Sequence, residues 1–196
     1  MSMQRAVTEA DILPRAEYAK LRAEARRRMA ELKRRRRVEV GPFVTFYFEN
    51  FATMRHQIQE MLWIEQGGAE QVPDELAAYN PLIPQGRELV ATFMIEIDDP
   101  VRRRNVLARL GGIEETAFIR IGDETVTARP EEDQDRTTAE GKASSVQFVH
   151  FPFTDAQVAK FRAAGAQVIL GLAHPNYGHM AVLPEAVRAE LAGDFA

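Results

Sequence analysis

The sequence contains no cysteine. This absence excludes structural disulfides, thiolate zinc sites, cysteine-ligated iron–sulfur clusters and a cysteine nucleophile within the chain. Any bound metal must therefore be held by histidine, aspartate or glutamate. No apolar run approaches the roughly 20 residues that a membrane-spanning helix needs, and the N-terminus lacks the apolar core of a signal peptide. We therefore expect a cytoplasmic protein with no membrane partner.

The common nucleotide-binding and hydrolase motifs are missing as well. The chain has no Gly-x-Gly-x-x-Gly sequence and no P-loop, and no Gly-x-Ser-x-Gly elbow surrounds Ser144 or Ser145. One acidic stretch lacks the regular ligand spacing of an EF-hand, and we interpret it as part of a solvated loop over residues 130–145. Its carboxylates are Glu131, Glu132, Asp133 and Asp135.

Charge divides the chain into two parts. The net charge is −4, but residues 1–37 hold 12 basic and 5 acidic side chains, against 13 basic and 24 acidic in residues 38–196. We predict a basic helical segment over residues 1–37 and an α+β domain over residues 38–196. The basic segment could bind an acidic partner, or it could dock on the acidic remainder of its own chain.

The first part has the pattern of a long amphipathic helix. Thr8 or Asp11 could cap it, Pro14 suits its first turn, and apolar residues recur at helical spacing up to Leu32. The run that follows could bind phosphates or an acidic protein, or could simply be solvated and complement the helix dipole. Nucleic acid is the less favoured partner, because no aromatic residue interrupts the run. The run consists of Lys33, Arg34, Arg35, Arg36 and Arg37.

The stretch over residues 44–66 predicts a strand that leads directly into a helix. β-Branched and aromatic residues fill its first five positions, and Asn50 offers a cap for the helix. His56 and Glu60 have the i, i+4 spacing of metal ligands, although a solvated pair on the outer face is the simpler interpretation. Trp63 falls on the same outer face, where it could be buried against a second copy in a homo-oligomer.

The remaining patterns predict alternating strands and short helices. Strands are expected at 88–97, 117–121, 125–128, 146–153, 168–173 and 180–183, with helices after Asp99, Thr154 and Pro184. The fold class is therefore α+β, with a mostly antiparallel mixed sheet, helices packed on it and the long N-terminal basic amphipathic helix.

A hairpin near the C-terminus offers a candidate metal site. His174 and His179 flank Pro-Asn-Tyr-Gly, and a symmetric four-residue turn would place them opposite one another, with Cβ atoms about 5 Å apart. His150 or Glu49 could complete the site. Imidazole and carboxylate ligands suit iron or manganese better than a thiolate-binding metal. Two polar residues at the mouth of a hairpin, without a metal, are the alternative.

Two long blocks and a short motif resemble a known family. They are KRRRRVEVGPFVTFYFENFATMRHQIQEMLWIE, DELAAYNPLIPQGRELVATFMIEID and the HPNY motif near the C-terminus. Over most of its length the chain is similar to an uncharacterised bacterial family, the domain of unknown function 3501. The resemblance implies no assigned activity and no catalytic residues. The genes of the family tend to lie near those of rubrerythrin-like and iron–sulfur oxidoreductase proteins, which implies a role in redox or peroxide stress.

The resembling blocks also suggest where polar residues could form a pocket. Together with Glu49 and His174, the candidates are Asn50, Gln57, Glu60, Tyr79, Asn80 and Asn176. Three functions follow as hypotheses. The first is an accessory protein that binds a redox protein and holds a non-haem metal through His and Glu. The second is a metal-dependent enzyme acting on a small substrate, and the third is a binding module built on the arginine-rich helix.

Overall fold

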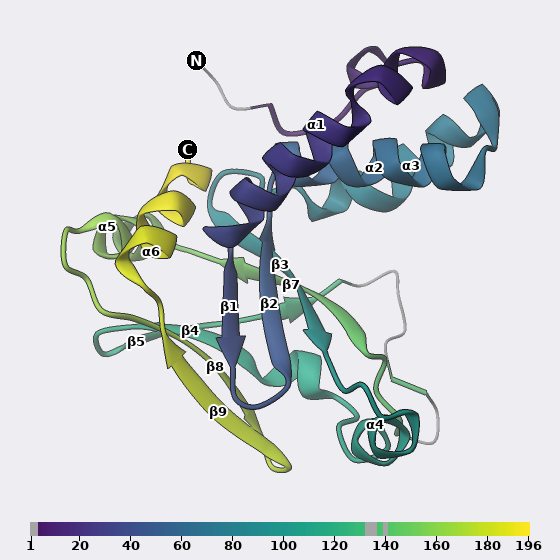
Figure 1. Cartoon of the computed structure of the whole chain (residues 1–196). Coiled ribbons are helices and arrows are strands. Elements are labelled where there is room, and N and C mark those ends of the chain that lie inside the picture. Colours follow the sequence, from purple (N-terminus) through teal and green to yellow (C-terminus); the bar gives the residue numbers. More distant parts are fainter. Residues whose placement is uncertain (1–3, 132–136, 139–140) are drawn as a thin grey trace.

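The computed structural model describes residues 4–131, 137–138 and 141–196, and it arranges them as strands with helices at both ends (Figure 1). The helices are α1 Arg15–Arg34, α2 Phe51–Glu65, α3 Val72–Tyr79, α4 Pro100–Leu107, α5 Asp155–Arg162 and α6 Glu185–Leu191. The strands are β1 Arg37–Val40, β2 Val44–Glu49, β3 Glu88–Ile95, β4 Ala117–Ile121, β5 Glu124–Thr127, β6 Arg129–Pro130, β7 Val146–Pro152, β8 Val168–His174 and β9 Tyr177–Val182. No helix within these residues is both long enough and apolar enough to cross a bilayer.

The strands form two antiparallel sheets. One has the order β1-β2-β3-β7-β6 and the other the order β5-β4-β8-β9. The α+β class is thus confirmed, but the strands are divided between two sheets where the sequence predicted one. The reason is visible in β4, whose side chains alternate between buried and half-buried. A strand of this kind has one apolar face, which the inner face of a second sheet covers.

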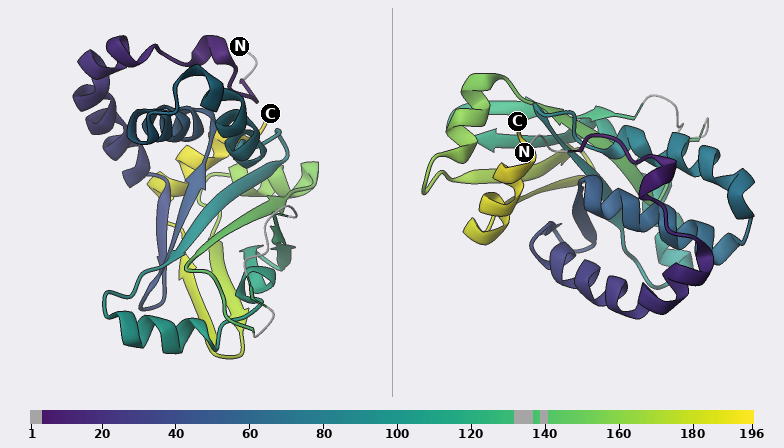
Figure 2. Two further views of the ribbon diagram at one scale, coloured as in Figure 1. Left: turned by 90° about the vertical axis from the view of Figure 1, so that its right-hand side faces the viewer. Right: turned by 90° about the horizontal axis from the view of Figure 1, so that it is seen from above.

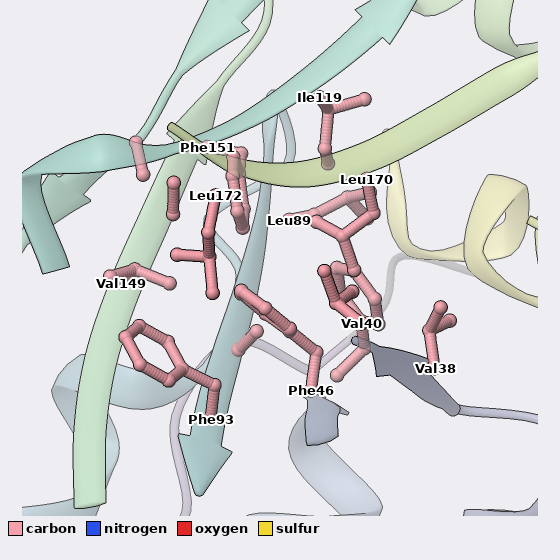
Figure 3. Close-up of a cluster of buried hydrophobic side chains, with 14 of the residues drawn as sticks. Val38, Val40, Phe46, Leu89, Phe93, Ile119, Val149, Phe151, Leu170 and Leu172 are labelled. Atoms are coloured by element: carbon pink, nitrogen blue, oxygen red, sulfur yellow. The ribbon is translucent and has the colours of Figure 1, made fainter. Parts of the chain in front are cut away.

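The main core lies between the two sheets (Figure 3). Phe46 of β2 packs on Phe93 of β3, with ring centroids 4.8 Å apart, and Leu170 and Leu172 of β8 approach from the other sheet. At one end of the core, Phe161 of α5 packs edge-on against Phe195, with centroids 5.4 Å apart. This arrangement places the apolar side chains of nearly every strand in one continuous cluster.

Helix α2 begins where the sequence predicts. The Asn50 side chain accepts a hydrogen bond from the Thr53 amide at 3.0 Å, and the Thr53 hydroxyl accepts one from the Asn50 amide at 2.9 Å. The apolar side of α2, with Met54 and Ile58, packs on Val90 of β3 in a second, smaller core. Helices α1, α2 and α3 thereby form a layer at one end of the sheets (Figure 2).

The chain before α1 does not form one helix with it, in contrast to the prediction. Thr8 caps a separate short turn over Glu9–Asp11, and the long helix begins only at Arg15, after Pro14. Two amide side chains hold this segment in place. Asn80 bonds both the amide and the carbonyl of Val7, at 2.7 and 2.9 Å, and Gln59 bonds both groups of Leu13, at 2.8 and 3.1 Å.

Candidate binding site between α1 and α2

The predicted pairing of His174 with His179 is wrong. The hairpin between β8 and β9 closes through only two residues, Pro175 and Asn176, so that His174 pairs with Tyr177 and His179 pairs with Leu172. Both His174 nitrogens face backbone groups: Nδ1 accepts from the Asn176 amide at 3.1 Å, and Nε2 lies 3.3 Å from the Gly111 carbonyl. His179 instead packs edge-on against the Tyr177 ring, with centroids 4.4 Å apart.

The other two predicted ligands lie in the other sheet. Glu49 accepts a hydrogen bond from the Thr92 hydroxyl at 2.8 Å, and its second oxygen is buried without a partner. His150 lies between the carboxylates of Glu88, 3.1 Å from Nδ1, and Glu131, 2.7 Å from Nε2. Hence His174, His179, His150 and Glu49 do not converge. The described residues contain no group of three or more His, Asp or Glu side chains arranged to hold a metal.

The sequence predicted that Glu131 is part of a solvated acidic loop, but its carboxylate contacts His150 of β7. Burial lowers the pKa of His150, but the hydrogen bonds and charges of Glu88 and Glu131 outweigh burial and raise that pKa above its usual value. Glu132, Asp133 and Asp135 lie outside the described residues.

The residues predicted to form a polar pocket make other contacts. Asn80 is committed to Val7, and the Asn176 side chain donates to the Arg109 carbonyl at 2.9 Å. Neither of the two cavities described below is lined by any of the six candidates: Asn50, Gln57, Glu60, Tyr79, Asn80 and Asn176. The amide side chains of Asn50, Asn80 and Asn176 instead bond backbone groups.

The arginine run does not present five free cations. Arg36 is only 1% exposed, and its guanidinium bonds the carboxylate of Asp194 as well as the carbonyls of Phe48 and Glu49, at 3.0 and 3.2 Å. Arg37 pairs with Glu39 at 2.6 Å, and Arg34 pairs with Glu31 at 3.0 Å. Within the described chain, Lys33 and Arg35 remain without an ion pair.

The outer face of α2 is covered by α1. The prediction that His56 and Glu60 form a solvated pair on this face is therefore wrong. The Glu60 carboxylate accepts from the Tyr18 hydroxyl at 2.6 Å and is held by two nitrogens of Arg22 at 2.9 and 2.8 Å. The bonds from Arg22 lower the pKa of Glu60. Trp63 lies under Arg15, whose guanidinium carbon is 4.4 Å from the ring centroid.

A groove of about 630 Å³ runs between the two helices beside these contacts, and we call it the α1–α2 groove. Its lining is Leu13, Tyr18, Leu21, Glu24, Ala25, Arg28, Met29, Leu32, Phe51, Ala52, Arg55, His56 and Gln59. The apolar stripe of α1 lies along it but is not sealed: Leu21 is 49% exposed, and Tyr18 is the one buried residue of the helix. The floor of the groove is therefore apolar and open to solvent.

Charged groups stand on both sides of this floor. Arg28 and Arg55 have no hydrogen bond or ion pair with any described residue. Burial lowers the pKa of His56, which favours the neutral imidazole at this position. The groove therefore offers two guanidinium groups that form no hydrogen bond or ion pair with a described residue, next to apolar surface, with Glu24 as an opposing charge.

A second cavity, of about 470 Å³, lies on the other side of the Leu13–Gln59 contact, and we call it the Trp63 cavity. It is bordered by the segment before α1, by the C-terminal half of α2 and by the loop that leads into α3, and it opens to solvent. Its lining is Glu9, Ile12, Leu13, Pro14, Arg15, Tyr18, Gln59, Leu62, Trp63, Gln66, Gly68, Ala69 and Val72. Both cavities therefore depend on how the N-terminal part docks on α2.

The comparisons with known proteins identify the family. Residues 6–195 match the model of the family described as protein of unknown function (DUF3501). The chain belongs to this family. It is also similar to a crystal structure, at 1.90 Å resolution, of a novel protein of unknown function from Burkholderia pseudomallei K96243, with 40% identity and a TM-score of 0.90. That likeness covers 97% of this chain and 100% of the other. No curated protein matches.

The DUF3501 match spans every residue that lines the two cavities. Sequence reasoning included Arg28 among the basic residues of the first helix but missed the groove residue Arg55 and the cavity residue Gln66. One signal was available, because α1 carries an apolar stripe while its other positions are charged, and such a stripe needs a surface to pack on. Only the structure shows that α2 covers this stripe incompletely.

Proposed function

We propose that this protein is a binding module that holds an acidic amphipathic helix of a partner protein in the α1–α2 groove. The observation that supports it best is the pairing of an open apolar stripe with two free arginines, Arg28 and Arg55, on its borders. Of the three functions considered from the sequence, this geometry favours the binding module. The arginine-rich helix acts here through its groove face and not through the run from Lys33 to Arg37.

The stripe has the spacing that another helix recognises. Leu21, Ala25, Met29 and Leu32 follow one another at intervals of four, four and three residues on α1. From Leu21 to Leu32 the stripe extends about 17 Å, or roughly three turns of helix. An amphipathic helix placed in the groove would bury this stripe together with Phe51 of α2.

The charges around the groove favour an acidic partner. Arg28 of α1 is exposed and lines the groove together with Arg55 of α2. A partner helix with glutamates or aspartates beside its apolar face would complement them, and opposite charges at the rim also speed association. The carboxylate of Glu24 would oppose an acidic side chain at its own end of the groove, which gives the partner helix a preferred direction.

The resemblance of the sequence suggests where the partner could come from. The expected redox context makes a rubrerythrin-like or iron–sulfur oxidoreductase protein the first candidate source of the helix. The protein would then be an accessory that positions a redox partner. This part of the proposal rests on the resemblance alone and is separable from the chemistry of the groove.

A fluorescein-labelled peptide with leucines on one face and glutamates beside them tests the groove directly by fluorescence anisotropy. We expect it to bind, and we expect Arg28→Glu to weaken binding by about 10- to 100-fold, because like charges then oppose one another. Arg27→Glu is the matched control: it is the neighbouring exposed arginine, changes the net charge equally, and does not line the groove. Equal losses in both variants would refute the groove as the site.

Other occupants give different results in the same experiment. If nucleic acid is the ligand, a labelled oligonucleotide binds with a steep salt dependence, and Arg27→Glu and Arg28→Glu weaken it alike. If a second copy fills the groove, light scattering shows a dimer that Arg28→Glu dissociates. Either result would replace the acidic helix as the occupant.

A further inference from the structure

The Trp63 cavity has the size and lining of a small-molecule site. Its volume of about 470 Å³ falls within the range of about 300–1,000 Å³ that is common for ligand pockets. Ile12, Leu62, Trp63 and Val72 supply apolar and aromatic wall from three separate segments of the chain. The two bonds between Gln59 and the Leu13 backbone fix the segment that closes one side.

Gln66 is the unusual residue of this cavity. It has φ 60°, in the left-handed region, and among the described residues it is the one non-glycine with positive φ. At the position that follows a helix, glycine or asparagine commonly takes this conformation because a longer side chain is disfavoured there. Gln66 is exposed, and its carboxamide, which has no hydrogen-bond partner among the described residues, is open to solvent at the edge of the cavity. A ligand in the cavity could therefore reach this carboxamide without breaking a bond within the protein.

The loop around Gln66 is fixed and not loose. The Gln71 side chain accepts from the Gly67 amide at 3.0 Å and donates to the carboxylates of Glu65 and Glu75, at 2.5 and 2.8 Å. Gln71 therefore ties the end of α2 to the start of α3. The backbone of Gln66 therefore belongs to a loop whose conformation is already set.

The charges of the lining favour an uncharged ligand. Arg15 is already engaged, because it donates to the Trp63 carbonyl at 2.8 Å and stacks on the Trp63 ring. Arg15 and Arg22, whose guanidinium carbons lie 4.4 and 5.2 Å from the Trp63 ring centroid, would repel a cation from the ring, and Glu9 would repel an anion. This distinguishes the Trp63 cavity from the α1–α2 groove, where two arginines are free.

We propose that the Trp63 cavity binds a small, uncharged aromatic molecule. Its rings pack on Leu62, Trp63 and Val72, and its polar edge forms a hydrogen bond with the Gln66 carboxamide, which can both donate and accept. This site is distinct from the groove and does not depend on the function proposed for it.

N-phenyl-1-naphthylamine is a suitable probe, because it is uncharged, aromatic and carries one N–H donor. Trp63 is the single tryptophan of the chain, so energy transfer from tryptophan to the bound probe reports on this cavity directly. We expect saturable binding with quenching of Trp63 emission. Ala69→Phe fills the cavity and should weaken binding about tenfold or more, since a ring then occupies the space of the ligand. Ala77→Phe, on the exposed surface of α3, is the control and should bind normally.

Gln66→Gly separates a ligand role from a structural one. Glycine relieves the left-handed strain, so the urea midpoint should rise while probe binding weakens. An increased midpoint with unchanged binding would refute the role of Gln66. Probe binding that is absent, or equal in Ala69→Phe and the unmodified protein, would refute the site. Arg28→Glu should leave probe binding unchanged, so this test and the peptide test can fail independently.

Discussion

Arg36 and Asp194 form a buried ion pair across 158 positions of sequence, which joins the end of α1 to the C-terminus of the chain. Burial raises the pKa of the Asp194 carboxyl, and the adjacent guanidinium opposes this effect by favouring the charged form. Arg36 also bonds two carbonyls at the end of β2. One side chain therefore fixes three parts of the fold.

Arg36→Met should destabilise the protein by about 3–5 kcal/mol, because it leaves the buried Asp194 carboxylate without its cation and two carbonyls without their guanidinium donor. Urea denaturation measures this loss. Arg35→Met changes an exposed neighbour of the same type and should cost less than about 0.5 kcal/mol. Equal costs in the two variants would contradict the assignment of Arg36 as the buried member of the run.

Gly41 allows the β1–β2 turn to approach β9 closely. It has φ +73°, and a Cβ at this position would lie 2.6 Å from both the Tyr177 hydroxyl and His179 Cγ. Gly41→Ala should therefore add an overpacking cost of about 1–3 kcal/mol to the cost of a left-handed alanine, about 1–2 kcal/mol. Gly122→Ala is the control, since it has φ +60° and open space around it. In chemical denaturation, the free energy of unfolding of Gly41→Ala should be clearly lower than that of Gly122→Ala.

His150 and His56 should titrate on opposite sides of the usual histidine pKa. At His150, burial lowers the pKa, but Glu88 and Glu131 outweigh it and raise the pKa overall. At His56, burial dominates and lowers the pKa. NMR titration of the imidazole C–H signals, assigned with His150→Gln and His56→Gln, measures both. A His150 pKa below that of His56 would contradict the geometry described.

The sign of the effect on stability follows from these directions. A raised pKa in the folded state means that the His150 contact contributes fully below the unfolded pKa of about 6.5 and is lost as the pH rises through the folded pKa. The pKa of Glu88 is lowered, so its contribution is lost as the pH falls through that value. His150→Gln should therefore lower stability most near pH 6 and least at alkaline pH, as denaturation at several pH values will show.

Local features of the fold could be predicted from the sequence, because local chemistry determines them. The start of α2 at Asn50 needs only a capping side chain and a helical apolar pattern, and the positions of most strands follow from alternation. The His174–His179 pairing was wrong because a turn of two residues and a turn of four place different residues opposite one another. Nothing within the hairpin sequence decided between them.

The candidate site was hidden for a different reason. From the sequence, the outer face of α2 is expected to be solvent-exposed because Glu60 and His56 are polar. In the structure, Tyr18 and Arg22 of α1 donate hydrogen bonds to the Glu60 carboxylate on this face. A polar contact between two helices has the same periodicity as a solvated face. Likewise, Arg36 is one of five consecutive basic residues, and only the tertiary position of Asp194 marks it as buried.

The contact of Glu60 with Tyr18 and Arg22 should control how firmly α1 is attached. The Arg22 and Glu60 side chains are 27% and 15% exposed, whereas those of the Arg34–Glu31 pair are 73% and 68% exposed. Glu60→Ala leaves the hydroxyl of the buried Tyr18 and the Arg22 guanidinium without their acceptor, which should cost about 1–3 kcal/mol. Glu31→Ala removes a solvated pair and should cost less than about 1 kcal/mol.

Hydrogen exchange gives the sharper measurement of how α1 is attached. Amides of α1 should exchange faster in Glu60→Ala, while those of β3 and β7 keep their protection, because the loss acts on the docking of one helix and not on the core between the sheets. Uniformly faster exchange across the sheets would show instead that α1 and the strands unfold as one unit.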